Sequence, residues 1–156
     1  MSATEVNLRE LTPKDLDLLL SIETDPENLL FSGAQSPPTA SELIDFLHSK
    51  HDLILHEQLR LVIEYRGTAM GFVDLFDVDF KKMKAFVGII ITNEFRQKGI
   101  AFQALKELET FARLYKIQCL WAKCQHQNFQ SLNLFKKAGF EEVSNNEDFI
   151  LLRLLL

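Results

Sequence analysis

The spacing of apolar residues changes along the chain and separates segments of helical and strand-like pattern. The run VNLREL, which begins at Val6, alternates like a short strand. We expect two helices next, one after Thr12 and one from about Thr39. Each begins with a threonine that is followed three residues later by an acidic residue, a pattern typical of a helix cap. An irregular segment with prolines connects the two helices.

The pattern then becomes that of strands. The runs LRLVIEY, AMGFVDLFDV and KAFVGIIIT predict three strands, with turns at RGT and near DFKKMK. A long helical stripe extends from Gly99 to Tyr115 and is followed by a strand, IQCLWAKC. A short helix over residues 129–138 is closed by Gly139, and two strands follow it.

The last of these strands contains the apolar tail FILLRLLL. We expect it to be a strand buried on both faces, and a membrane anchor is the alternative. The predicted order is β-α-α-β-β-β-α-β-α-β-β. This order indicates an α/β (α+β) fold with a mixed, mostly antiparallel central sheet and flanking helices. No linker, repeat or low-complexity segment divides residues 1–156, so we expect one domain.

Composition narrows the class of protein. The 156 residues are 47% hydrophobic and 25% charged, as in ordinary soluble domains. A net charge of -5 argues against nucleic-acid binding and weakly favours a cationic partner. Cys119 and Cys124 are expected on opposite faces of one strand, which disfavours a disulfide and favours a reducing, cytoplasmic location. The first ten residues do not have the pattern of a signal peptide, and no apolar run is long enough to span a membrane.

The segment RQKGIA joins an apolar strand to the long helix. The first N–H groups of a helix lack partners within the helix and lie at the positive end of its dipole, so this position suits an anion. Gly99 allows the backbone to approach a ligand closely, and Arg96 and Lys98 add positive charge. The patterns GxxxxGK[ST] and GxGxxG are absent, which disfavours a P-loop hydrolase. A glycine turn with solvated charges is the alternative.

Together with NFQSLNLFKKAGF at residues 128–140, this segment resembles the GNAT acyltransferase superfamily. The resemblance is to the branch of spermidine and ribosomal-protein N-acetyltransferases, and it covers nearly the whole chain. It implies a GNAT-like fold and an acetyl-CoA-dependent N-acetyltransferase without a metal. The implied substrate is a primary amine, either on a small molecule such as a polyamine or at a peptide N-terminus.

The resemblance also implies how acetyl-CoA would bind. Backbone N–H groups of residues 97–101 would hold its pyrophosphate, and the backbone of residues 89–91 would pair with its pantetheine arm. The next strand would diverge and open the cleft. Asn128 would lie at the mouth of this cleft and Ser131 on the helix that lines the thioester end. The residues expected at acetyl-CoA are Ile89, Ile90, Ile91, Arg96, Gln97, Lys98, Gly99, Ile100, Ala101, Asn128, Ser131 and Phe135.

Two positions depart from the pattern of the family. The tyrosine that often serves as general acid is Phe135 here, and a carboxylate that is common on the preceding strand is Lys123. The sequence therefore identifies no catalytic acid or base, although positioning of an amine beside a thioester contributes much of the rate by itself. The nearest acidic candidates, each with an exposed turn position as the alternative, are Asp74, Asp77 and Asp79.

Other residues support weaker interpretations. We expect no metal site at His48, His51 and His56, because their spacing is loose and a fourth ligand is missing. Trp121 and most phenylalanines are expected in the core. The acidic residues of the first helices would face either a cationic acceptor or solvent, and they are Asp15, Asp17, Glu23, Asp25 and Glu27.

Two other classes of function stay open. The missing tyrosine motivates a non-catalytic GNAT-fold module that binds or senses acyl-CoA. An interaction protein that assembles through the apolar tail is the third hypothesis, and a homodimer is compatible with all three. We expect neither nucleic acid nor a membrane as a partner.

Overall fold

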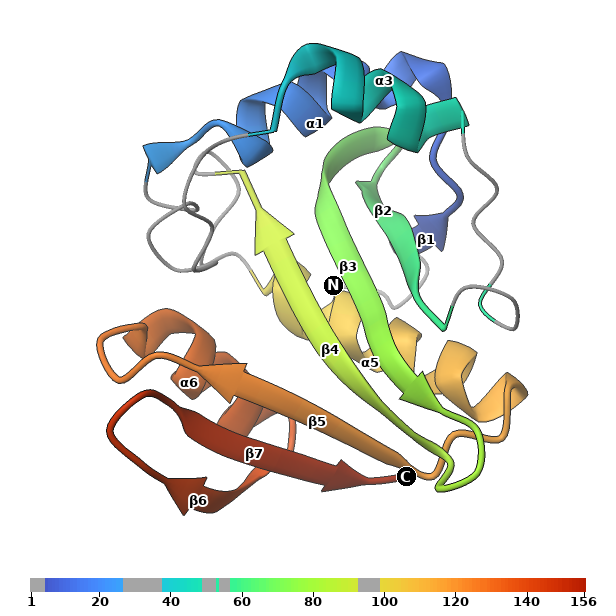
Figure 1. The fold of residues 1–156 in the computed structure, drawn as a ribbon. Helices are drawn as coiled ribbons and strands as arrows, with labels where there is room; N and C mark the ends of the chain where they lie inside the picture. The colour runs from blue at the N-terminus through green and yellow to red at the C-terminus, as the bar shows by residue number, and fades with distance from the viewer. Residues whose placement is uncertain (1–4, 27–37, 49–52, 54–56, 93–98) are drawn as a thin grey trace.

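One sheet of seven strands organises the protein (Figure 1). The computed structural model describes residues 5–26, 38–48, 53, 57–92 and 99–156. The strands stand in the order β1-β2-β3-β4-β5-β7-β6, and every neighbouring pair is antiparallel except β4 and β5. This confirms the predicted mixed, mostly antiparallel sheet. The strands are β1 (Val6–Arg9), β2 (Leu59–Tyr65), β3 (Thr68–Asp79), β4 (Lys84–Ile91), β5 (Cys119–Cys124), β6 (Glu141–Asn145) and β7 (Ile150–Leu155).

Helices cover the two faces of the sheet at different places (Figure 1). On one face, α1 and α3 bury leucines and an isoleucine against Val62 and Phe72. On the other face, α5 and α6 pack on a larger apolar cluster that includes Leu105 and Phe135. The described helices, whose order along the chain agrees with the predicted one, are the 3-10 helix η2 (Pro13–Asp15), α1 (Leu16–Glu23), α3 (Ala40–His48), α5 (Ile100–Leu114) and α6 (Phe129–Lys137).

The centre of the sheet opens between β4 and β5. These strands pair only over Lys84–Phe86 with Cys119–Trp121. Beyond Phe86, β4 continues beside β3, while β5 stays paired with β7 along its whole length. Figure 1 shows the two strands diverging from this short junction. The divergence that the resemblance implied is therefore confirmed.

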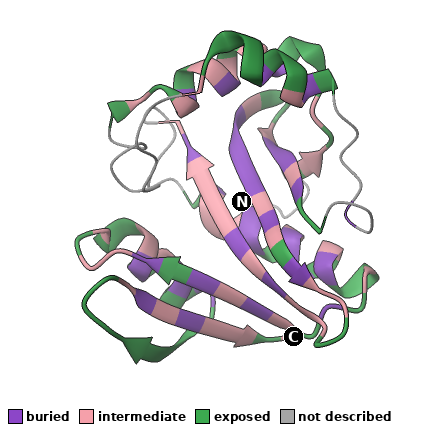
Figure 2. Cartoon of the chain, in the orientation of Figure 1, coloured by how far each residue is buried: buried purple, intermediate pink, exposed green. Residues whose placement is uncertain are grey.

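The tail forms strand β7 as predicted, but the expectation of burial on both faces is wrong. Ile150 and Leu152 are buried, whereas Leu155 is 69% exposed. The cause is the placement of the helices, because α5 and α6 cover one face of this part of the sheet and no described element covers the other (Figures 1 and 2). Trp121 lies on the same uncovered face and is only half-buried, so its assignment to the core is also wrong.

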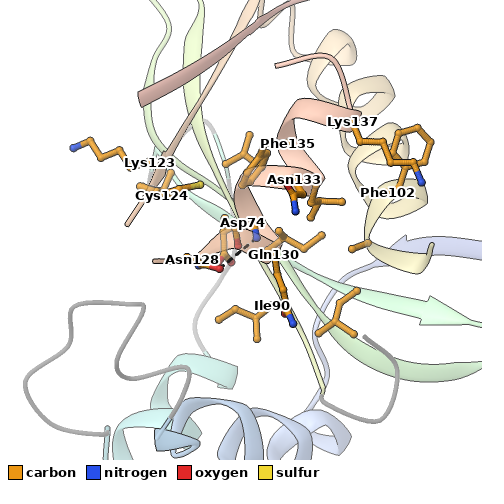
Figure 3. Close-up of a pocket in the computed structure, with 18 of the residues that line it drawn as sticks. Asp74, Ile90, Phe102, Lys123, Cys124, Asn128, Gln130, Asn133, Phe135 and Lys137 are labelled. Carbon is orange, nitrogen blue, oxygen red and sulfur yellow. Dashed lines mark hydrogen bonds between the residues drawn. The ribbon is translucent and has the colours of Figure 1, made fainter. Parts of the chain in front are cut away.

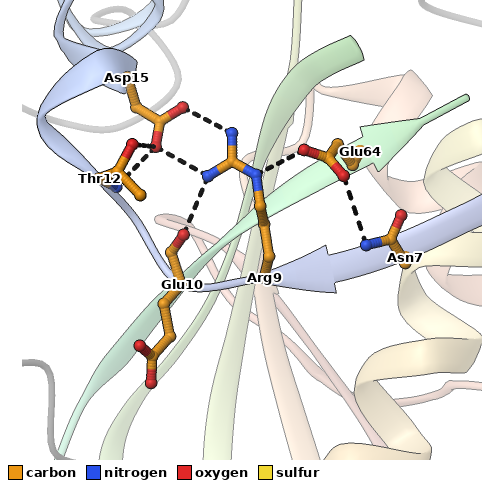
Figure 4. A network of polar contacts seen from close by, with 6 residues as sticks. All are labelled: Asn7, Arg9, Glu10, Thr12, Asp15 and Glu64. Carbon is orange, nitrogen blue, oxygen red and sulfur yellow. Dashed lines mark hydrogen bonds and ion pairs between the residues drawn. The ribbon is translucent and has the colours of Figure 1, made fainter. Parts of the chain in front are cut away.

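A polar network fixes the start of the chain to the sheet (Figure 4). The guanidinium of Arg9 donates to both carboxylate oxygens of Asp15 at 2.9 and 2.8 Å, and its Nε donates to Glu64 at 2.6 Å. The N–H of Thr12 donates to the same carboxylate of Asp15 at 2.8 Å, as expected for a capping box. Asp15 is 3% exposed, so the expectation that it faces an acceptor or solvent is wrong. The hydrogen bond from Arg9 lowers the pKa of Asp15 below its usual range.

We predict that Asp15→Asn lowers the free energy of unfolding at neutral pH by about 1–3 kcal/mol, because Arg9 loses a charged partner. The pKa of Asp15 is lower in the folded than in the unfolded state, so its stabilising effect is complete above about pH 4 and declines in acid. Urea unfolding of both proteins should therefore give a difference that shrinks as the pH falls below about 4. Asp17→Asn, at an exposed neighbouring position, is the control and should change little. A difference that does not vary with pH would contradict this account.

Candidate functional site

A cavity of about 800 Å³ occupies the space between the diverging strands (Figure 3). Its walls come from β3, β4, the first turn of α5, the end of β5 and the exposed side of α6. The short pairing of β4 with β5 creates this space, because a fully paired sheet would bring the two backbones within about 5 Å of each other.

The wall from β4 combines buried side chains with a free backbone edge. Ile91 is 6% exposed, and Ile89 and Ile90 pack against the clusters on the two faces of the sheet. On one side β4 is hydrogen-bonded to β3 as far as Ile91, but on the other side no described strand pairs with residues 87–91. The three isoleucines therefore line the cavity, and no described strand occupies their backbone edge; their contact with acetyl-CoA stays a prediction.

Two glycines shape this wall in different ways. A Cβ atom at Gly71 of β3 would lie 2.1 Å from the carbonyl oxygen of Ile90, so only glycine fits there without displacement of β4. A Cβ atom at Gly88 would meet the carboxylate of Asp74 at 3.4 Å, an ordinary contact. Gly71 thus maintains the position of β4, whereas Gly88 leaves room in the cavity.

The two glycines give a matched prediction. Gly71→Ala should lower the free energy of unfolding by about 1–3 kcal/mol, because β4 must move to accommodate the methyl group. Gly88→Ala should leave the stability nearly unchanged and reduce the space for a ligand beside β4. Thermal unfolding measures the first effect and calorimetric titration with a ligand the second. Equal thermal midpoints for the two variants would show that the position of β4 does not depend on Gly71.

The second wall is the first turn of α5. Gly99 precedes this helix with a φ of 78°, in the left-handed region that favours glycine. No described side chain caps the helix, and within the described residues its first N–H groups are available to an anion. Gly99 and Ala101 line the cavity, whereas the side chain of Ile100 is buried and anchors the helix in the core. The predicted phosphate contacts of Arg96, Gln97 and Lys98 lie outside the described residues.

Lys137 supplies a described cation to this part of the cavity, and the sequence analysis did not identify it. Its ammonium lies 5.1 Å from the centre of the Phe102 ring, and both residues line the cavity. Figure 3 shows Lys137 of α6 beside Phe102 of α5. The only sequence signal was the lysine pair before the AGF motif, which by itself is typical of the end of a helix.

Helix α6 brings three of the predicted residues to the cavity. Asn128 precedes the helix, and its Oδ1 accepts a hydrogen bond from the N–H of Ser131 at 3.3 Å. Both residues line the cavity. Phe135 lines it too, but it is 3% exposed and packs edge-on against Phe140 with ring centres 5.0 Å apart. Phe135 therefore belongs to the core and has no proton to donate.

Cys124 at the end of β5 is a further lining residue (Figure 3). Burial raises the pKa of its thiol to about 11. The thiol is consequently protonated at neutral pH, and a neutral thiol is a poor nucleophile. We therefore do not assign covalent catalysis to Cys124.

An acidic group with an arginine lies where the cavity approaches α1. Arg60 donates through Nε and Nη2 to the two oxygens of Asp74, at 2.7 and 2.9 Å, and through Nη1 to Glu23 at 2.6 Å. Its guanidinium also lies 5.1 Å from the centre of the Phe72 ring. All three charged residues line the cavity, and their formal charges sum to one negative charge. The sequence analysis named Asp74 and Glu23 among other acids but did not identify Arg60.

The other acidic candidates do not line this cavity. Asp77 is exposed and lines a smaller pocket, of about 490 Å³, beside α3, and this pocket is also lined by Asp74, Arg60 and Glu23. Asp79 accepts hydrogen bonds from the N–H groups of Lys81 and Lys82, which lower its pKa and make it a cap of the β3–β4 turn. An irregularity in strand pairing between Phe76 and Asp79 separates both residues from the regular register of Asp74.

The remaining expectations concern histidines, acids and membrane spans. His48 accepts or donates through Nδ1 to the carbonyl oxygen of Ile44, and His51, His56 and Glu27 lie outside the described residues. Asp17 is exposed. Among the described residues there is no group of three or more histidine, cysteine, aspartate or glutamate side chains that would bind a metal. Within the same ranges, no helix has the length and apolar content needed to cross a membrane.

Comparisons with known proteins agree with this geometry. A family profile described as "Acetyltransferase (GNAT) domain" matches residues 5–141. Spermidine N(1)-acetyltransferase of Escherichia coli (strain K12) is 29% identical over 145 residues, which cover 89% of this chain and 74% of that protein.

Solved structures show the same fold. Spermidine N-acetyltransferase from Vibrio cholerae, in complex with CoA and spermine, superposes with a TM-score of 0.83 at 17% identity, over 97% of this chain and 96% of that one. The ribosomal L7/L12 alpha-N-protein acetyltransferase RimL, in complex with CoA, gives a TM-score of 0.82 at 17% identity, over 98% and 95% of the two chains.

Proposed function

The chain belongs to the GNAT acetyltransferase family as an N-acetyltransferase, and on this basis we propose that it binds acetyl-CoA in the cavity between β4 and β5. We propose further that it transfers the acetyl group to a primary amine held near Asp74. The observation that carries the proposal is the presence of a free strand edge and a free helix start in the same cavity. Acetyl-CoA supplies an acetyl group activated as a thioester.

The described residues fit such a ligand in two respects. The unpaired edge of β4 at residues 87–91 suits the amide groups of a pantetheine arm, which can hydrogen-bond to it as an added strand would. The start of α5 suits phosphate, because backbone N–H groups and the helix dipole favour an anion there. Lys137 adds a cation beside the same turn. In this proposal Arg96, Gln97 and Lys98 complete the phosphate contacts.

The group of Arg60, Asp74 and Glu23 supports an amine as the acceptor. Its net negative charge attracts an ammonium, and hydrogen bonds from Arg60 orient the two carboxylates. Asp74 stands opposite Gly88 in the strand register, and its carboxylate would lie 3.4 Å from a Cβ atom at Gly88, so it lies close to β4. An amine at Asp74 is thereby directed toward the acyl end of a ligand bound along β4. The names of the related proteins point to the same substrate class, which includes both polyamines and protein N-termini.

The described residues contribute to the transfer mainly by position. The ammonium first loses a proton to solvent water, because only the neutral amine has the lone pair that attacks. A bond then forms between the amine nitrogen and the acetyl carbon, the bond from that carbon to sulfur breaks, and the nitrogen gives its second proton to solvent water. Asp74 is held in a bidentate ion pair and Phe135 has no proton to exchange, so neither is assigned this proton transfer. Alignment of an amine with a thioester contributes several kcal/mol to the lowering of the barrier, and a thiolate leaves without an acid.

A non-catalytic module that senses acyl-CoA is a second candidate, and the identity of Phe135 is the observation that favours it. Such a module would bind CoA and acetylate none of the amines offered. We also propose a reducing, cytoplasmic location, to which the free thiols of Cys119 and Cys124 are suited.

We predict that Lys137→Gln weakens CoA binding about five- to tenfold, because a cation near the phosphates is lost. Lys136→Gln is the matched control, since this residue is the adjacent lysine on α6 and does not line the cavity. Calorimetric titration with CoA and with pantetheine, which lacks phosphates, measures both effects. Pantetheine should bind the Lys137 variant as it binds the natural protein. An equal loss for the two ligands would mean that Lys137 shapes the cavity rather than binds phosphate.

Asp74→Asn tests the proposed binding of the acceptor amine near Asp74. We expect kcat/KM for the amine to fall about ten- to a hundredfold, because the ammonium loses its charged partner, while CoA affinity stays the same. Asp17→Asn is the control, because Asp17 is exposed and lines neither this cavity nor the smaller pocket beside it. Mass spectrometry of products from polyamines and N-terminal peptides follows the reaction. CoA binding by the natural protein without transfer to any amine would support the sensing module instead.

A further inference from the structure

The open face of the sheet carries cations stacked on aromatic rings. Lys84 and Arg153 lie 5.9 and 5.5 Å from the centre of the Trp121 ring. Lys123 lies 5.1 Å from the ring of Phe86 and 5.0 Å from that of Phe149. We call this set the cation–aromatic strip, and its members are Lys84, Phe86, Trp121, Lys123, Phe149 and Arg153.

Strand register gathers these residues on one face. Phe86 stands opposite Trp121 across the β4–β5 junction, and Trp121 stands opposite Arg153 across β5 and β7. Residues directly opposite each other in a sheet project to the same side. No described helix covers this side beyond α1 and α3 (Figure 1). The strip is therefore an open surface of the described protein.

The three cations of the strip are available to pair with an anionic partner. None of the three forms an ion pair with a described residue. Asp79 stands opposite Lys84 in the register and Glu141 opposite Arg153, yet neither carboxylate reaches its neighbour as an ion pair. A cation over an aromatic ring remains able to bind an anion from its open side.

The strip is continuous with the part of the cavity around Asp74, where we propose that the acceptor amine binds. Lys123 belongs to both, and Phe76 of β3, which lines the cavity, stacks on Phe86 with ring centres 5.7 Å apart. A chain whose terminal amine lies at Asp74 could therefore continue past Phe76 and Phe86 toward Trp121. The aromatic rings offer contact area, and the three cations offer charge along that path.

We infer that the strip selects an acceptor polypeptide whose residues after the N-terminal amine are acidic. This inference rests on the proposed function, because it assigns the acceptor of the same site. Carboxylates of the polypeptide pair with Lys84, Lys123 and Arg153, whereas a basic segment is repelled there. The preference is opposite to the effect of total charge, since a protein of net charge -5 attracts cationic chains in general.

The fluorescence of Trp121 offers a direct measure of binding to the strip. It is the one tryptophan of the sequence, and its Nε1 is buried without a hydrogen-bond partner among the described residues. A carboxylate that pairs with Lys84 or Arg153 would change the electrostatic environment of the ring. Intrinsic fluorescence therefore reports occupancy of the strip independently of turnover.

The test uses three peptides of equal length with free N-termini and identical first two residues, followed by an acidic, a neutral or a basic segment. Spermidine is the fourth acceptor. We expect kcat/KM to be about tenfold or more higher for the acidic than for the basic peptide. We also expect the acidic peptide alone to change the fluorescence of Trp121. Both effects should weaken with added salt.

The test variant carries both Lys84→Glu and Arg153→Glu, and it keeps Lys123, which lines the cavity. It should reverse the preference between acidic and basic peptides and leave the rate with spermidine and the affinity for CoA within about twofold. Arg113→Glu is the matched control, because Arg113 is exposed on α5 and lies outside the strip. Circular dichroism and CoA binding establish that each variant is folded.

The outcomes separate this inference from the proposed function. Equal use of the three peptides with an unchanged fluorescence would overturn the strip and leave the acetyltransferase proposal standing. A fluorescence response to the acidic peptide, reversed in the variant, without transfer to any amine would support the strip and overturn the proposed function. A change in molecular mass of the variant by light scattering, with peptide preference unaltered, would assign the strip to contact between two copies. A stronger response to single-stranded oligonucleotide than to the acidic peptide would likewise overturn it.

Discussion

The limited pairing of β4 with β5 is the constraint on which the remaining arrangement depends. Three residues on each strand hold the two halves of the sheet together, and beyond Phe86 the strands separate. The separation leaves one edge of β4 without a partner among the described strands, and the backbone groups of such an edge must be satisfied by solvent or a ligand. The same separation brings the first turn of α5 and the side of α6 to a common cavity. The divided sheet and the cavity are thus consequences of a single geometric feature.

The elements of the fold could be predicted from the sequence because their signals are local. The caps at Thr12 and Thr39, the stripe after Gly99 and the glycine after α6 depend on residues within a few positions of each other. The burial of β7 could not be predicted in this way. Whether Leu155 faces a helix or solvent depends on where α5 and α6 lie across the sheet, and this is a tertiary property. The same reason accounts for the misplacement of Trp121.

The residues of the candidate site also fall into two groups, those with a local sequence signal and those that depend on tertiary structure. The turn at Gly99 and the helix start at Asn128 are each recognised from a few neighbouring residues, and both reach the cavity. Arg60 and Asp74 are fourteen residues apart on different strands, and only the register of β2 against β3 makes them a bidentate pair. Asp15 shows the converse error, because its position in a helix cap was visible while its ion pair with Arg9 was not. Local patterns identify turns and caps, whereas charge pairs across a sheet require the register.

Two charged regions of opposite sign lie along this face, and under the proposed function they limit which amines suit the site. Near Asp74 the net charge is negative, so any alkylammonium is attracted there. Farther along the same face Lys84 and Arg153 are positive. A short polyamine that ends before Trp121 meets only the first region, whereas a longer cationic acceptor meets repulsion in the second. An acceptor with a terminal amine followed by carboxylates matches both signs in order. Because screening reduces both interactions beyond about 10 Å in ordinary salt, discrimination depends on contacts close to the strip rather than on the charge of the protein as a whole.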